Sequence, residues 1–180
     1  LVNIFSGSVV VNAARGVALQ LSNAVQSFVT NFMTAVNPQI TKSYAAGEHE
    51  YMFSLMRKSS RMAYYLLMII VLPVMFNTDM LLNLWLGEVP AMSSGFARLF
   101  LVLALSESLS GPLLTGMLAT GRIRDYQILV GGLLMLNFPV SYIFLKCGAP
   151  VEVTVIVAIV ISQLCLFVRL YMLRRQMRFP

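Results

Sequence analysis

Long runs of apolar residues, separated by short segments that hold most of the charges, constrain this chain more than any other feature. Residues 64–74 and 153–161 are almost uninterrupted apolar runs. Strands of a membrane β-barrel would instead alternate apolar and polar residues over about ten positions. A helix needs about 20 mainly apolar residues to cross a bilayer. The pattern therefore predicts an all-α fold, a polytopic transmembrane helix bundle.

Composition excludes most soluble classes of protein. Apolar residues make up 58% of the chain and charged residues only 11%, whereas soluble domains average about 45–50% and about 25%. So few charges leave too little polar surface to coat a water-soluble domain. We therefore expect no soluble enzyme, no disordered tail and no nucleic-acid partner.

Residues of the usual catalytic and metal-binding types are sparse. Cys147 and Cys165 have neither disulfide nor metal spacing, and His49 has no second ligand at a suitable distance along the chain. The sequence contains no glycine-rich phosphate loop, nucleophile elbow or pair of catalytic carboxylates. We expect no enzyme activity, no metal and no cofactor.

Five segments are long and apolar enough to be spans, at about residues 8–36, 62–86, 96–118, 126–145 and 151–173. Residues 1–7 are expected to end an earlier helix. Asn37-Pro38 is expected to end the first span, because the residue before a proline is disfavoured in the α conformation. Residues 48–61 are expected to form a short amphipathic helix on the membrane surface, with Tyr51, Met52, Leu55 and Met56 toward lipid.

The basic residues predict the orientation in the membrane. With five spans, three basic regions fall on one side: Lys42, Arg57, Lys58 and Arg61; Arg122 and Arg124; Arg169, Arg174, Arg175 and Arg178. The opposite side keeps only Arg15, Arg98 and Lys146. Because cytoplasmic loops collect Lys and Arg, the three regions are expected in the cytoplasm.

The first predicted span carries a stripe of polar residues along one edge. On a helical wheel the stripe contains Asn12, Asn23, Gln26, Ser27, Thr30, Thr34 and Asn37, with Arg15 beside it. Lipid satisfies none of these groups, so the stripe must face protein or water. Two interpretations stay open: hydrogen bonding between helices, or a hydrated cavity that passes a polar cargo. Arg15 favours a pathway for an anion, unless it reaches the interface instead.

The later spans add an acidic residue and two helix-breaking segments. Glu107 is expected near mid-membrane, on the opposite face of its helix from Arg98, where a coupling role or a structural role is open. Ser110-Gly111-Pro112 is expected to interrupt its helix. Asn137 and Pro139, near the centre of the next span, form a milder version of the same helix-breaking pattern. Interrupted helices at membrane depth are common in transporters.

Several stretches resemble bacterial polysaccharide-biosynthesis membrane proteins. They are residues 11–20 (VNAARGVALQ), 37–47 (NPQITKSYAAG), 84–86 (LWL), 110–113 (SGPL) and 119–123 (ATGRI). The chain is similar over its whole length to the O-antigen, or lipid-linked oligosaccharide, flippases of the multidrug/oligosaccharidyl-lipid/polysaccharide exporter superfamily.

The resemblance implies a fragment of the second bundle of a MATE-like exporter fold, lacking the N-terminal bundle of the same protein. It implies a bacterial inner-membrane flippase with a lipid-linked glycan as substrate and membrane lipid around it. Arg15, Asn23, Gln26 and Thr30 would contact substrate, while Glu107, Pro112 and Asn137 would serve coupling or structure. Two alternatives stay open: a multidrug or organic-cation antiporter of the same superfamily, and a non-transporting membrane scaffold.

Overall fold

In the computed structural model, residues 9–121 and 123–177 are described, and every regular element within them is an α-helix. The helices are α2 (Val9–Ala45), α3 (His49–Phe76), α4 (Thr78–Leu86), α5 (Ser93–Ser108), α6 (Ser110–Ala119), α7 (Ile123–Met135), α8 (Asn137–Lys146) and α9 (Val153–Met177). Residues 1–7, where the end of an earlier helix was expected, lie outside the described residues. Arg122 and Arg178, which were expected on the cytoplasmic side of the membrane, also lie outside them.

Four stretches are long and apolar enough to cross a membrane: His49–Phe76, Ser93–Ala119, Ile123–Lys146 and Val153–Gln176. They correspond to the last four predicted spans, as expected of a multi-pass membrane protein. Among the described helices, α2 does not reach the same apolar content, because its polar stripe lowers its hydropathy. That α2 crosses the membrane stays a prediction.

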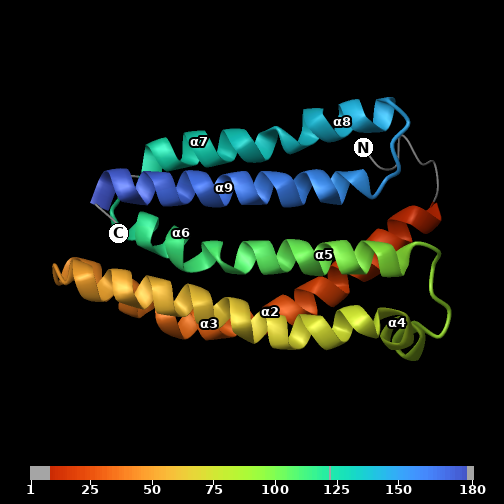
Figure 1. Cartoon of the computed structure of the whole chain (residues 1–180), viewed down its shortest axis with the longest axis horizontal. Helices are drawn as coiled ribbons and strands as arrows, with labels where there is room; N and C mark the ends of the chain where they lie inside the picture. Colours follow the sequence, from red (N-terminus) through yellow and green to blue (C-terminus); the bar gives the residue numbers. More distant parts are fainter. Residues whose placement is uncertain (1–8, 122, 178–180) are drawn as a thin grey trace.

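The long helices α3 and α9 and the α5–α6 and α7–α8 pairs form roughly parallel rods, and α2 crosses α5 obliquely (Figure 1). Helix α9 lies between the α7–α8 rod and the α5–α6 rod, and α2 and α3 pack on the other side of α5–α6. Helices α2 and α5 approach each other where their side chains are small, because small residues let two helix backbones come close together. Ala14 and Ala18 of α2 are fully buried in one cluster with Phe96 and Ala97 of α5.

The expectation that Asn37-Pro38 ends the first helix is wrong. Helix α2 continues to Ala45 with Pro38 inside it. An interior proline removes one backbone hydrogen bond and costs about 3 kcal/mol. Beyond the proline, Ile40 and Ser43 are buried against neighbouring helices. Tertiary contacts therefore keep the last two turns helical despite the local penalty.

The expectation of a short surface helix at residues 48–61 is also wrong. This segment is the first half of α3 and continues without a break into the membrane-spanning half. Met52 and Met56, which were expected to face lipid, are fully buried among Ile40, Leu113 and Met117. The amphipathic face covers other helices of the same chain, and only Tyr51 stays more than half exposed.

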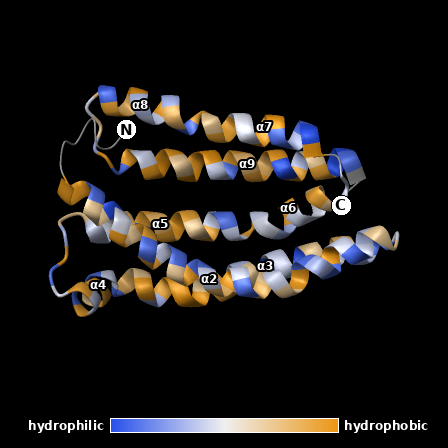
Figure 2. Ribbon diagram, turned by 180° about the vertical axis from the view of Figure 1, so that it is seen from behind, coloured by the Kyte–Doolittle hydropathy of each residue, from blue (hydrophilic) through white to orange (hydrophobic). Residues whose placement is uncertain are grey.

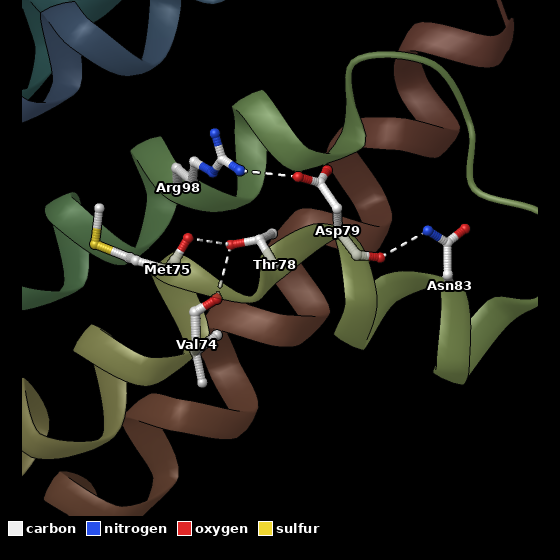
Figure 3. A network of polar contacts seen from close by, with 6 residues as sticks. All are labelled: Val74, Met75, Thr78, Asp79, Asn83 and Arg98. Atoms are coloured by element: carbon white, nitrogen blue, oxygen red, sulfur yellow. Dashed lines mark hydrogen bonds and ion pairs between the residues drawn. The ribbon is translucent and has the colours of Figure 1, made fainter.

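The predicted span at 62–86 is divided at Asn77 into α3 and α4 (Figure 3). The Asn77 backbone N–H and side-chain amide both donate to the Pro73 carbonyl, and the Thr78 hydroxyl donates to the Val74 carbonyl at 2.8 Å. Such side-chain bonds to the preceding turn compete with regular helix bonding. The chain bends at this point.

Two further rods are interrupted, each three residues before a proline. Helix α5 gives way to α6 at Leu109, ahead of Pro112, and α7 gives way to α8 at Leu136, ahead of Pro139. A proline lacks the N–H that would bond to the residue four positions earlier. At the first break the Ser60 hydroxyl of α3 donates to the Leu109 carbonyl at 3.4 Å.

The chain turns place the described basic regions together. The α2–α3 turn, the α6–α7 turn and the end of α9 lie at one end of the bundle (Figure 1), which we call the basic end. The α4–α5 and α8–α9 loops lie at the opposite end. Lys42, Arg124, Arg174 and Arg175 are all exposed at or near the basic end.

Candidate functional site

A crevice of about 470 Å³ runs between the α5–α6 rod, the α7–α8 rod and α9. Its polar lining comes from five helices: Arg15 of α2, Glu107 of α5, Ser110 of α6, Asn137 of α8, and Ser162 and Arg169 of α9. Its walls are apolar, with Phe100, Leu103, Leu114, Leu134 and Ile161 among them. We call this space the crevice.

Arg15 reaches the crevice from the first turns of α2. Its guanidinium carbon lies 6.0 Å from the centre of the Phe100 ring, a cation–π arrangement. The described residues provide it with no ion pair. Arg15 also lines a second pocket of about 420 Å³, with Asn137, Ser141 and Thr154. Its positive charge therefore remains available to an anion in either space.

Arg169 lies at the other end of the crevice, toward the basic end. Its Nε donates to the Tyr126 hydroxyl at 3.1 Å, and its guanidinium carbon is 6.0 Å from the centre of that ring. Tyr126 of α7 is buried, so it fixes the orientation of the arginine. In the sequence analysis, Arg169 served only as one of the basic residues that predict the orientation in the membrane. Its position inside the predicted span at 151–173 is the signal that could have singled it out, because a charged residue within a span is rare.

Glu107 lies where the crevice meets a smaller groove. The groove, of about 230 Å³, is lined by Gln26, Thr30 and Thr34 of α2 and by Glu107 and Ser108 of α5. Glu107 and Arg169 both line the crevice but form no direct ion pair. A ligand in the crevice would therefore meet one carboxylate flanked by two arginines.

The polar stripe of α2 is only partly in contact with these spaces. Gln26 and Thr30 line the groove with Glu107, whereas Asn23 is exposed and lines neither the groove nor the crevice. The Thr30 and Thr34 hydroxyls donate to carbonyls of their own helix at 3.1 and 2.9 Å. Their oxygens still offer lone pairs to a donor in the groove.

Each of the two helix interruptions places a polar group on the crevice. Pro112 is buried in the first turn of α6, two residues after Ser110, and follows the break at Leu109. The Ser110 Oγ is buried, lines the crevice and has no hydrogen-bond partner among the described residues. Asn137 begins α8 and accepts a hydrogen bond from Ser141 at 3.1 Å. The crevice thus contains an unsatisfied hydroxyl beside an interrupted helix.

Arg98 does not belong to this site. It forms an ion pair with Asp79 of α4 at 2.9 Å, and both side chains are largely exposed (Figure 3). Exposed pairs of this kind contribute about 0.2–1 kcal/mol. The bond links the start of α5 to α4 at the end opposite the basic end.

The crevice can hold a polar, multiply charged ligand. Its two guanidinium groups suit phosphate oxygens, and its hydroxyls and amide suit sugar hydroxyls. Within the described residues, no group of His, Cys, Asp and Glu side chains is placed to hold a metal ion. No family model, curated protein or solved structure matches this chain.

Proposed function

We propose that this bundle belongs to a flippase that moves a lipid-linked oligosaccharide across the bacterial inner membrane for surface polysaccharide synthesis. In this proposal the chain is part of the second helix bundle of a MATE-like exporter, and an N-terminal bundle of the same protein completes the pathway. The crevice is the observation that carries the proposal, because it places charged and hydroxyl groups between apolar helices.

The charges in the crevice favour an anionic cargo. Arg15 and Arg169 outnumber Glu107, and neither arginine is ion-paired within the described residues. A pyrophosphate held by charge-assisted hydrogen bonds would compensate one of these cations. Both arginines are half-buried between apolar helices. A cation without an anion is costly in a low-dielectric setting, and such residues by default mark a functional site.

The remaining polar lining favours a glycan. Ser110, Asn137 and Ser162 add donors and acceptors to the crevice, the first two directly after the two helix breaks. Sugars present many hydroxyls that both donate and accept, as do these side chains. Gln26 and Thr30 extend the polar surface into the neighbouring groove.

Reconstitution of the protein at its natural length into liposomes tests the proposal. A fluorescent lipid-linked oligosaccharide would be added to both leaflets, and membrane-impermeant periodate would oxidise the glycans that reach the outside. We expect oxidation of nearly all glycan with the active protein and of about half in empty liposomes. Arg169→Gln should slow the flipping, while Arg174→Gln, an exposed arginine outside the crevice, should not. Equal oxidation with and without protein would refute the proposal.

One observation favours organic-cation export as a second candidate function. Glu107 lines both the crevice and the groove, and a carboxylate there suits a cationic cargo. If this candidate is right, Glu107→Gln abolishes drug resistance in cells that depend on the protein. Arg15→Gln would then leave resistance intact, whereas the flippase requires Arg15 for glycan export.

A further inference from the structure

A separate pocket of about 480 Å³ lies between α7 and α9 at the basic end. It is lined by Asp125, Ile128 and Leu129 of α7 and by Tyr171, Met172, Arg175 and Gln176 of α9. None of these residues lines the crevice. We call it the α7–α9 pocket.

The polarity of this pocket changes along the helix axes. Asp125 is in the first turn of α7, and Arg175 and Gln176 are in the last turn of α9, so these polar groups share the outer level. About one turn deeper, Ile128, Leu129 and Tyr171 provide an apolar wall that is at least half exposed. Figure 2 shows hydrophilic residues where α7 begins and α9 ends, and hydrophobic ones further along both helices. A ligand with a polar head and an apolar chain fits this gradient.

The polar groups of the pocket do not satisfy one another. Asp125 and Arg175 carry opposite charges but form no ion pair. The Gln176 Oε1 atom is buried and has no hydrogen-bond partner among the described residues. The pocket therefore presents two acceptors, the Asp125 carboxylate and the Gln176 carbonyl oxygen, beside one cationic donor.

We propose that the α7–α9 pocket binds phosphatidylethanolamine. The Arg175 guanidinium donates to the lipid phosphate, and the lipid ammonium donates to Asp125 and Gln176. One acyl chain then lies against Ile128, Leu129 and Tyr171. This inference is independent of the proposed function, because it needs only that the basic end lies at a membrane–water boundary.

The headgroup chemistry predicts a specific order of affinities. Phosphatidylcholine has the same charges, but its quaternary ammonium has no N–H to donate to Asp125 or Gln176. Phosphatidylglycerol keeps the phosphate but offers no cation to Asp125. A charge-assisted hydrogen bond is worth enough to change affinity by about tenfold. We therefore expect phosphatidylethanolamine to bind about tenfold more tightly than either of the other lipids.

Native mass spectrometry of the detergent-purified protein at its natural length measures these affinities. Palmitoyl-oleoyl lipids with the three headgroups would be titrated separately. Asp125→Asn should reduce the preference for phosphatidylethanolamine over phosphatidylglycerol, because the charge is lost while Gln176 still accepts from the lipid ammonium. Arg175→Gln should lower the affinity for each of the three lipids by about tenfold. Arg174→Gln and Glu50→Gln, exposed charges outside the pocket, should leave the affinities unchanged.

Three results would overturn the inference. They are equal binding of the three lipids, tighter binding of phosphatidylglycerol, and equal losses from Arg174→Gln and Arg175→Gln. Because Asp125 and Arg175 are exposed, their substitution should not prevent folding, and circular dichroism and the gel-filtration profile would check this.

Discussion

Arg15 illustrates how one side chain connects the polar stripe of α2 to a space formed by three other rods. Its only described partner is the face of Phe100, which screens the cation without neutralising it. A cation held by a π face stays free to bind an incoming anion. Arg15 can act through its positive charge and through the donor geometry of its guanidinium group. Substitutions can distinguish these two contributions.

We predict that Arg15→Ala in the protein at its natural length lowers glycan export at least about tenfold at normal abundance. Arg15→Lys should retain part of the activity, because the charge survives while the two-pronged donor geometry is lost. Export is measured as surface glycan per unit of membrane-inserted protein. Arg98→Ala is the control, because that arginine pairs with Asp79 outside the crevice. Full export by Arg15→Ala would rule out the role.

A second residue-scale prediction concerns the bond between α2 and α6. The Thr115 hydroxyl donates to the Asn37 Oδ1 at 2.8 Å, next to the interior proline of α2. Hydrogen bonds between membrane helices average about 0.6 kcal/mol in double-mutant cycles and reach about 1.7 kcal/mol. We expect Asn37→Ala and Thr115→Val to show a coupling of this size in unfolding free energy measured in detergent micelles. Strict additivity of the two substitutions would show that the bond contributes nothing.

At the scale of helices, the departures from prediction share a cause. Local signals located the interruptions near Pro112 and Pro139 well, because a missing N–H acts within its own helix. Local signals failed at Pro38, where contacts made by Ile40 outweigh the proline penalty. Met52 and Met56 could be placed on an amphipathic face, but the pattern does not say whether lipid or protein covers that face.

The packing of α3 against α6 leads to a prediction about Gly116. A Cβ at this position would collide with the sulfur and terminal methyl of Met56, which is fully buried. We expect Gly116→Leu to lower the unfolding free energy by about 1–3 kcal/mol, because the core cannot take the added volume. A thermal-shift measurement in detergent detects the change as a lower midpoint.

Gly131→Leu is the matched control for that substitution. Nothing lies within 4 Å of a Cβ at Gly131, so its midpoint should stay the same or rise slightly. Adding Met56→Ala to Gly116→Leu should recover part of the lost stability by making room for the leucine. An unchanged midpoint for Gly116→Leu alone would contradict the close contact.

At the scale of the whole molecule, the ends of the bundle predict its orientation. The basic end should face the cytoplasm, because Lys and Arg are retained on that side. Cys147, which is exposed at the opposite end, is a natural reporter, whereas Cys165 is buried. In intact cells, a membrane-impermeant maleimide should label Cys147.

Introduced cysteines complete this topology experiment. In a Cys147→Ser, Cys165→Ala background, Glu88→Cys should be labelled from outside, while Glu48→Cys and Ile123→Cys should be labelled only after permeabilisation. Labelling of Glu48→Cys in intact cells without labelling of Glu88→Cys would reverse the orientation.

The sequence alone determined the helical class, four of the apolar spans and the gathering of basic residues at one end. Each of these depends on hydropathy and charge summed over many residues, so no single contact can change it. Only the tertiary structure decided that Arg15, Glu107 and Arg169 share one crevice, and that Asn23 stays outside it. These residues lie far apart along the chain, and their meeting depends on how the rods pack and where they bend, which periodicity within one helix does not encode.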